Sequence, residues 1–247
     1  MLFKQGRMHP EISSFSNEIF YEKKLKPIPL KHQLEILHCP SYDKSDGLQN
    51  LIASHRLAFI VSKGDKNPIS DKTNKDEAIR ISALLKTIYT INKNNFNPQT
   101  VGVIVPYRNQ IALIRKEIKQ LNIPALSDIT IDTVERYQGS ERDFIIYGFT
   151  VQKIYQLEFL TGNVFKDNGQ TIDRKLNVVL TRARKQLFLI GNPQILSYNI
   201  IFQKLIKFID NRQGVCDIPT EYFIQGKFSC SPADKTSVPD SRQKLNV

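Results

Sequence analysis

The sequence is poor in several residue types and patterns, and each absence excludes a class of protein. Its 247 residues include no tryptophan and only three cysteines, none of which stands in a C-x-x-C pair. A small, odd number of cysteines argues against a disulfide framework and for a reducing compartment. No apolar run approaches about 20 residues, so we expect no membrane span. Because "MLFKQGR" at the start lacks the apolar core of a signal peptide, we expect a cytoplasmic, nucleoid or nuclear protein that is not secreted.

Metal-binding and phosphate-binding patterns are missing as well. His32, His38 and Cys39 lie close together, but no second ligand cluster follows at a familiar spacing, so no metal site is predicted. The G-x-x-x-x-G-K-[ST] pattern does not occur, and the one Gly-Lys pair begins at Gly226, outside any glycine-rich loop. No strand ends in Asp-Glu to hold magnesium, since "KDEA" opens a helix. The sequence therefore contains neither a recognisable phosphate-binding loop nor a recognisable magnesium-binding strand end.

The chain carries a large excess of positive charge. Its 35 Lys and Arg residues outnumber 24 Asp and Glu residues, which gives a formal net charge of +11. With 40% hydrophobic and 24% charged residues, the composition is that of a globular protein. Nucleic acid or the phosphates of a nucleotide would be suitable partners for this charge. The composition is equally compatible with a basic protein that has no such partner.

Apolar patterning in the middle of the chain alternates between strands and helices. Short apolar runs with strand character are, in order, "LAFIVS", "TVGVIVP", "DITIDTV", "DFIIYGFTV" and "QLFLIG". Helical spacing marks "KDEAIRISALLKTIYTI", "RNQIALIRKEIKQL" and "KLNVVLTRARK". This alternation predicts an α/β fold with a mostly parallel sheet flanked by helices on both faces. Strands that are apolar throughout fit such a doubly covered sheet.

The two ends of the chain differ from its middle. Residues 1–215 are predicted to form one domain with a truncated N-terminal edge, because no strand is recognisable ahead of "GRMHP". Residues 216–247 are predicted to be a C-terminal extension. From about residue 229 onward the extension is polar with scattered charge, which predicts disorder.

Four stretches are candidates for the functional site. They are "VPYRNQ" (105–110), "DTVERYQGSERD" (132–143), "KLNVVLTRARK" (175–185) and "KQGRMHPEISSFSNEIFYEKKL" (4–25). In open α/β sheets, function gathers at the carboxyl ends of the strands. We therefore expect these stretches to lie at or near such ends.

Together, these stretches resemble the second RecA-like domain of superfamily 1 helicases, a P-loop NTPase-type fold, here without its own P-loop. The similar blocks are "QGRMHPEISSFSNEIFYEKKL" (the arginine-Met-His-Pro block), "VGVIVPYRNQ" (motif IV), "IDTVERYQGSERDFII" (motif V) and "LNVVLTRARKQLFLIGNP" (motif VI). They run in family order from Gln5 to about Pro193. More narrowly, they resemble the 5′-to-3′ group that includes the nonsense-mediated-decay RNA helicase and the nuclease-helicase that processes Okazaki fragments.

Two arginines have the catalytic role that this resemblance implies. In such helicases ATP lies between two RecA-like domains, and the second domain supplies arginines to the γ-phosphate. Arg182 of "LTRAR" matches the motif VI arginine finger, and Arg7 of "GRMHP" matches a second phosphate-contacting arginine. A guanidinium suits this role because it is permanently charged and binds phosphate oxygens through two parallel hydrogen bonds. From the residues alone, Arg182 could instead be a surface arginine paired with a carboxylate.

Motif V and the rest of motif VI contain the implied nucleotide-binding residues. Glu141 resembles the carboxylate that hydrogen-bonds the nucleotide ribose, and Gly139 would allow close backbone approach. Gln138 could contact phosphate or nucleic acid. Arg184 belongs to the same set, but residues two apart on a helix face different directions. If Arg182 reaches ATP, Arg184 is expected to brace the sheet or to contact nucleic acid.

The implied nucleic-acid contacts come from motifs IV and V. Thr133 aligns with a hydroxyl residue that touches the nucleic-acid backbone in relatives, a contact that carries no sequence information. Pro106, Tyr107 and Gln110 of motif IV are the other candidates. Ordinary turn chemistry could also explain Thr133 and Gln138, and Tyr107 could simply pack. Gly6 departs from the family, whose eukaryotic members often have tyrosine there, so no base-stacking role is assigned to it.

The resemblance implies the C-terminal motor half of an ATP-dependent DNA or RNA helicase. Its partners would be single-stranded nucleic acid and an N-terminal half with a P-loop, in cis or in trans, which would hold most of the ATP and Mg²⁺. The chain would be inactive by itself, because it has no phosphate-binding loop. The alternative is a non-catalytic module, derived from a helicase domain, that binds nucleic acid or a protein. An unrelated nucleotide-binding α/β enzyme is the third reading.

Overall fold

The computed structural model describes residues 4–37, 39, 42–65, 68, 70–137, 139–162, 164–167 and 170–225. The side chains of residues 164–167, 170–172 and 225 are not part of this description. Gln138, His38 and the tail expected to be disordered from about residue 229 lie outside the described residues. In the parts of the chain that are described, no helix combines the length and the apolar character needed to cross a membrane.

The centre of the fold is a six-stranded sheet in which every neighbouring pair of strands is parallel. Its order is β10 (Val215–Cys216), β3 (Leu57–Val61), β9 (Ala183–Gly191), β6 (Arg142–Gly148), β4 (Val101–Val105) and β5 (Thr130–Thr133). The α/β class and the parallel sheet predicted from the sequence are confirmed. Val215 and Cys216 belong to the sheet, so the domain extends past the predicted boundary at residue 215.

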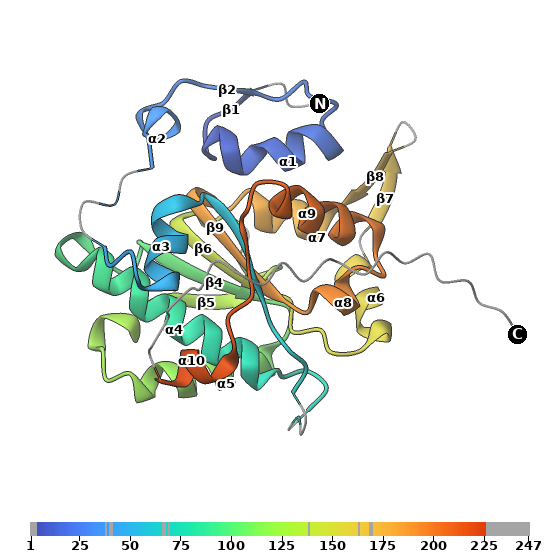
Figure 1. The fold of residues 1–247 in the computed structure, drawn as a ribbon. Coiled ribbons are helices and arrows are strands. Elements are labelled where there is room, and N and C mark those ends of the chain that lie inside the picture. Colours follow the sequence, from blue (N-terminus) through green and yellow to red (C-terminus); the bar gives the residue numbers. More distant parts are fainter. Residues whose placement is uncertain are drawn as a thin grey trace, which may run out of the picture.

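Helices cover both faces of this sheet, as Figure 1 shows. One face packs against α1 (Pro10–Phe20), α7 (Arg174–Leu180), α8 (Pro193–Leu196) and α9 (Ile200–Asp210). The other face packs against α3 (Gly47–Ser54), α4 (Lys75–Ile91), α5 (Arg108–Gln120) and α10 (Thr220–Gln225). Successive residues of β9 alternate between the two cores, Leu187 and Leu189 in the first and Phe188 and Ile190 in the second. Both faces are therefore buried, which explains why the strands are apolar throughout.

Smaller elements surround the main sheet. β1 (Lys4–Gln5) and β2 (Lys26–Pro27) form a parallel pair, and β7 (Val164–Asp167) and β8 (Gln170–Asp173) form an antiparallel pair. The remaining helices are α2 (Lys31–Leu34), α6 (Leu157–Thr161) and the 3₁₀ turns η1 (Lys93–Asn95), η2 (Pro124–Leu126) and η3 (Ile154–Gln156). The short strand β1 lies directly ahead of Gly6 and Arg7, but it pairs with β2 outside the six-stranded sheet, so the truncated N-terminal edge stays a prediction.

The predicted helix over residues 175–185 is shorter in the structure. Asp173 caps α7 by accepting a hydrogen bond from the backbone N of Leu176 (3.0 Å), and the helix ends at Leu180. Arg182 lies in the connection that follows, whereas Arg184 is already part of β9. The two arginines therefore do not share a helix, and the helical argument for their different directions was wrong.

The parallel arrangement separates the candidate residues between two edges of the sheet. Glu141 immediately precedes β6, and Arg182 immediately precedes β9, so both lie at the amino edge. Tyr107 follows β4 and Thr133 ends β5, so these two lie at the carboxyl edge. The expectation that all candidate stretches lie near carboxyl ends was therefore wrong for Glu141 and the motif VI arginines. Residues 134–141 connect the two edges.

Candidate functional site

The amino edge contains a cluster of arginines and carboxylates built from segments far apart in the sequence. The Nε of Arg7 donates to Oε2 of Glu141 at 2.7 Å, and its Nη1 lies 3.4 Å from the carbonyl oxygen of Thr181. Both side chains of this ion pair remain about 40% exposed, at 40% for Arg7 and 39% for Glu141. The pair is thus preformed but accessible to a ligand.

Arg7 is held in place through its own backbone. The side-chain oxygen of Gln5 accepts hydrogen bonds from the backbone N of Arg7 (3.1 Å) and of Met8 (2.9 Å). His32 Nε2 lies 2.8 Å from the carbonyl oxygen of Arg7. The backbone N of His9 donates to the carbonyl oxygen of Arg184 at 2.9 Å, which ties the N-terminal block to β9. These contacts explain how a residue near the N-terminus reaches the edge of the central sheet.

Arg184 is paired on the same edge. Its Nε and Nη2 contact Oδ1 of Asp143 at 2.8 Å and 2.7 Å, and its Nη1 lies 3.7 Å from Oε1 of Glu141. Glu141 therefore lies between Arg7 and Arg184. The two sheet strands β6 and β9 are bridged by the contact between Arg184 and Asp143, which is the bracing role that the sequence left open.

Arg182 differs from both neighbours, because it is buried and incompletely paired. Its side chain donates through Nη1 to the carbonyl oxygen of Ser140 at 3.5 Å, and the residue is 8% exposed. Among the described residues, no group accepts a hydrogen bond from its buried Nε. Burial, and after it the positive charge of Arg7, lowers the pKa of Arg182. A buried donor without a partner costs about 1–3 kcal/mol, so an anion placed here would gain a strong partner.

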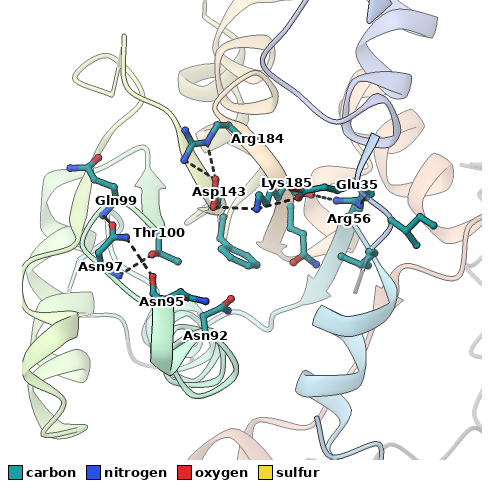
Figure 2. Close-up of a pocket in the computed structure, with 14 residues that line it drawn as sticks. Glu35, Arg56, Asn92, Asn95, Asn97, Gln99, Thr100, Asp143, Arg184 and Lys185 are labelled. Carbon is teal, nitrogen blue, oxygen red and sulfur yellow. Dashed lines mark hydrogen bonds and ion pairs between the residues drawn. The ribbon is translucent and has the colours of Figure 1, made fainter. Parts of the chain in front are cut away.

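A polar pocket of about 290 Å³ opens beside this cluster, at the amino ends of β3, β9, β6 and β4. Figure 2 shows Asp143 between Arg184 and Lys185, with Glu35 and Arg56 further along the same wall. Lys185 Nζ lies 3.7 Å from Asp143 and 3.3 Å from Glu35. Arg56 Nη1 donates to the carbonyl oxygen of Lys185 at 3.3 Å. The cations of this pocket are therefore already engaged with protein groups.

The connection between the edges is fixed by a glycine on the neighbouring strand. Tyr137 is buried against β4, where a Cβ atom on Gly102 would lie 1.7 Å from the tyrosine Oη. Only glycine leaves room for this ring at the middle of the strand. Further along, Gly139 has φ +85° and no atom lies within 4 Å of a Cβ placed there. Its backbone conformation and open surroundings fit a turn that a ligand can approach closely.

The carboxyl edge has a different kind of site, a hollow of about 500 Å³. It is lined by Lys72, Pro106, Tyr107, Arg108, Asn109, Thr133, Glu135 and Arg136. Lys72, Arg108 and Arg136 are exposed, and none of them forms an ion pair with another described residue. Glu135 is paired with Lys175 at 3.2 Å. The hollow therefore presents unpaired positive charge.

Gln110 is the candidate that the structure does not bring to this hollow. It is fully buried, and its amide contacts the backbone N and O of Asn74 at 2.8 Å and 2.9 Å. Its side chain is thus unavailable to a strand, and its role here is to hold the start of α4. Below the same edge, Glu77 accepts a hydrogen bond from the backbone N of Thr150 at 2.8 Å. Burial raises the pKa of Glu77 to about 8.

Comparison with known proteins identifies the family. A family model described as an AAA domain matches residues 1–194. The chain belongs to this AAA domain family. The match includes every candidate residue at both edges.

Curated relatives of this AAA domain have low but extensive identity. An uncharacterized ATP-dependent helicase from Methanocaldococcus jannaschii is 28% identical over 210 residues, which covers 83% of this chain and 28% of that protein. The human DNA replication ATP-dependent helicase/nuclease DNA2 is 25% identical over 232 residues, which covers 87% of this chain and 21% of that protein. The Drosophila melanogaster homolog of regulator of nonsense transcripts 1 is 26% identical over 216 residues, which covers 85% of this chain and 16% of that protein. The resemblance found in the sequence is confirmed, although the chain spans less than a third of each relative.

Within the AAA domain, the sequence motifs pointed to most of the residues that meet at each edge. Arg7, Glu141, Arg182 and Arg184 meet at the amino edge. Sequence reasoning missed Asp143, which is the main partner of Arg184 and stands inside the motif V block. At the carboxyl edge it missed the unpaired cations of the hollow. Arg108 and Arg136 stand inside the quoted motifs, so their positive charge was the available signal.

Proposed function

We propose that this AAA domain is the C-terminal motor half of an ATP-dependent superfamily 1 helicase or translocase. The amino edge would face ATP held by another domain, and the carboxyl edge would hold the backbone of single-stranded nucleic acid. The observation that carries the proposal is the buried guanidinium of Arg182, which lies next to the preformed Arg7–Glu141 ion pair. Its Nε has no hydrogen-bond partner among the described residues. This is the arrangement that a phosphate would complete.

Each residue of the amino edge has its own role in the proposed function. Arg182 and Arg7 stabilise negative charge on the γ-phosphate during hydrolysis, because guanidinium groups remain charged and bind phosphate oxygens in pairs. Glu141 accepts a hydrogen bond from the ribose, and the turn at Gly139 lets the backbone approach the nucleotide. Arg184 holds Glu141 and Asp143 in place. Mg²⁺ and most of the ATP would be held by the domain that carries the P-loop, in cis or in trans.

The carboxyl edge suits a contact with the sugar-phosphate backbone. Thr133, Pro106 and Tyr107 line the hollow together with unpaired lysine and arginine side chains. Cations of this kind neutralise phosphates without reading the base sequence, and such binding weakens as salt increases. The family resemblance further implies stepping in the 5′-to-3′ direction.

One experiment tests the motor assignment. The chain is combined with the P-loop-bearing domain of a relative, and ATP hydrolysis is measured with and without a single strand. We expect strand-stimulated hydrolysis that Arg182→Ala lowers by about 10³-fold or more. The matched control is Arg212→Ala, which removes an exposed arginine just after the end of α9. If Arg182→Ala hydrolyses ATP as fast as the parent, the arginine-finger assignment is wrong.

A non-catalytic binding module is the second candidate function. It is favoured by the absence of G-x-x-x-x-G-K-[ST] in the sequence together with the unpaired cations of the hollow. This candidate predicts salt-dependent strand affinity that does not respond to ATP or to the added P-loop domain. Strand affinity measured by fluorescence anisotropy, with and without both additions, distinguishes it from the motor half.

A further inference from the structure

A half-exposed aromatic ring lies beside the carboxyl-edge hollow. Phe159, in α6, is 47% exposed and stacks on Tyr107 with ring centroids 4.9 Å apart and planes 24° from parallel. Tyr107 itself lines the hollow and is 9% exposed. The buried tyrosine therefore fixes the orientation of an outer ring that the hydrophobic core does not cover.

Lys175 links this ring to the charged wall of the hollow. Its Nζ lies 4.2 Å from the centroid of the Phe159 ring and donates to the carbonyl oxygen of Phe159 at 3.1 Å. The same ammonium pairs with Glu135, which lines the hollow, at 3.2 Å. Lys175 thus covers the ring with a charge that has a second partner within reach. A flat group that replaced the ammonium over the ring would leave it paired with Glu135.

We propose that Phe159 is a base-stacking subsite for single-stranded nucleic acid that crosses the carboxyl edge. The inference deepens the strand contact in the proposed function and rests on it. Arg136 and Lys72 in the hollow would take phosphates, while one base stacks on the ring and displaces the Lys175 ammonium. The displaced ammonium keeps its ion pair with Glu135, and a base gains binding free energy when it stacks on an aromatic ring, so the exchange is favourable. Every base has a flat face, so the subsite tolerates any sequence.

An apolar protein partner is the competing occupant of this surface. Ile154 and Tyr155 nearby in sequence are also exposed, at 52% and 56%. A protein partner that packed on Phe159 would have to bury the ion pair of Lys175 and Glu135 beside an apolar surface, which costs the desolvation of both charges. A nucleic acid strand instead supplies phosphates next to the displaced ammonium. The charge around the ring therefore favours the strand.

The absence of tryptophan from the chain makes a direct test possible. In Phe159→Trp the introduced indole is the only one in the protein, and a stacked base quenches indole fluorescence. We expect its emission to fall when a 5′-labelled thymidine 20-mer is added, while a fully abasic strand of the same length leaves it unchanged. The matched control is Phe96→Trp, because Phe96 pairs with Tyr89 (5.2 Å between centroids) near the amino edge. Its emission should not respond to either strand.

Affinity measurements complete the test. Anisotropy of the labelled strand should show that Phe159→Leu weakens binding of the thymidine strand about tenfold. Binding of the abasic strand and the salt dependence should not change, since no cation is lost. Equal losses on both strands would assign the ring to a structural role and overturn the proposal.

The remaining outcomes are equally decisive. If the labelled strand binds while the indole of Phe159→Trp does not respond, base stacking is wrong and the backbone contact stands. If the parent chain binds no strand, with or without the P-loop domain, the proposed strand contact fails and the subsite with it. If the indole responds to the P-loop domain but not to the strand, the surface is a protein interface instead.

Discussion

The two edges of the central sheet treat charge in opposite ways. At the amino edge, Arg7 and Arg184 are held on Glu141 and Asp143 at 2.7–2.8 Å, and Arg182 is buried beside them. At the carboxyl edge, Lys72, Arg108 and Arg136 are exposed without ion pairs among the described residues. A preformed ionic cluster suits one ligand in one geometry, since it costs little reorganisation when charge develops. Exposed, unpaired cations suit a long polyanion that is bound through its phosphates, whatever its base sequence.

The largest expected difference between the edges comes from Arg7→Ala. In the presence of the P-loop domain it should lower ATP hydrolysis by about 10²–10³-fold, the usual effect of removing one donor to a developing negative charge. Strand affinity without nucleotide should stay within about twofold of the parent, because Arg7 lies at the other edge. Stability should change little, since half-exposed ion pairs contribute about 0–1 kcal/mol. An equal loss of strand affinity would show that the edges are not separate.

Glu77→Gln tests how the buried carboxylate below the carboxyl edge affects the stability of the protein. The pKa of Glu77 is raised from 4.5 to about 8 in the folded protein, so folding favours its protonated form. Its contribution to stability is fully present below about pH 4.5 and is lost as the pH rises toward 8. Glutamine cannot ionise, so the variant should be more stable than the parent above pH 8, by about 2–4 kcal/mol. Urea unfolding at pH 5 and pH 8.5 measures this, and an unchanged difference between the two proteins would contradict it.

Gln110→Leu separates architecture from binding at the same edge. The substitution leaves the backbone N of Asn74 buried without its partner, so we expect a loss of about 1–3 kcal/mol in the free energy of unfolding. Strand affinity of the folded protein should fall less than twofold, because the side chain is not accessible. Gln120→Leu, at the exposed end of the same helix, is the control. A large loss of affinity without a loss of stability would restore Gln110 as a strand contact.

The smallest expected effect is that of Arg136→Ala. Removing one unpaired cation should weaken strand binding about three- to tenfold and reduce the slope of log affinity against log salt by about 0.7–1. ATP hydrolysis at saturating strand should remain close to that of the parent. Lys116→Ala, which removes an exposed charge from α5, should leave the slope unchanged. If the parent, Arg136→Ala and Lys116→Ala had the same slope of log affinity against log salt, the hollow would not be part of the nucleic-acid binding site.

Much of the fold was predictable, because burial leaves a local pattern. The helix predicted for "KDEAIRISALLKTIYTI" is α4, with the same limits, Lys75–Ile91. The helix predicted through Lys185 failed because the side chains of Arg182 and Arg184 do not reveal where the chain leaves the helix for β9. Spacing identifies the type of a long element better than it identifies its end.

The site was predictable in its residues but not in its geometry. Motifs named Arg7, Glu141 and Arg182, yet the expected position at carboxyl ends was wrong for all three. A connection between parallel strands runs from the carboxyl edge to the amino edge, so a residue just after one strand and a residue just before the next lie at opposite edges. Gln110 illustrates the same point, since a polar residue after a strand looks accessible until α4 is packed above it.

The sequence by itself determined the class of fold, the excess of positive charge and the helicase resemblance, because each depends on residue type and local order. Only the tertiary structure decided that the candidate residues form two sites on opposite edges of one sheet. It also decided that Arg7 pairs with a carboxylate 134 positions away, and that Phe159 stands beside Tyr107. Such pairings depend on how distant segments meet, and side-chain hydrogen bonds and stacking act only over a few ångströms. A linear pattern records which side chains avoid water, but not which of them become neighbours.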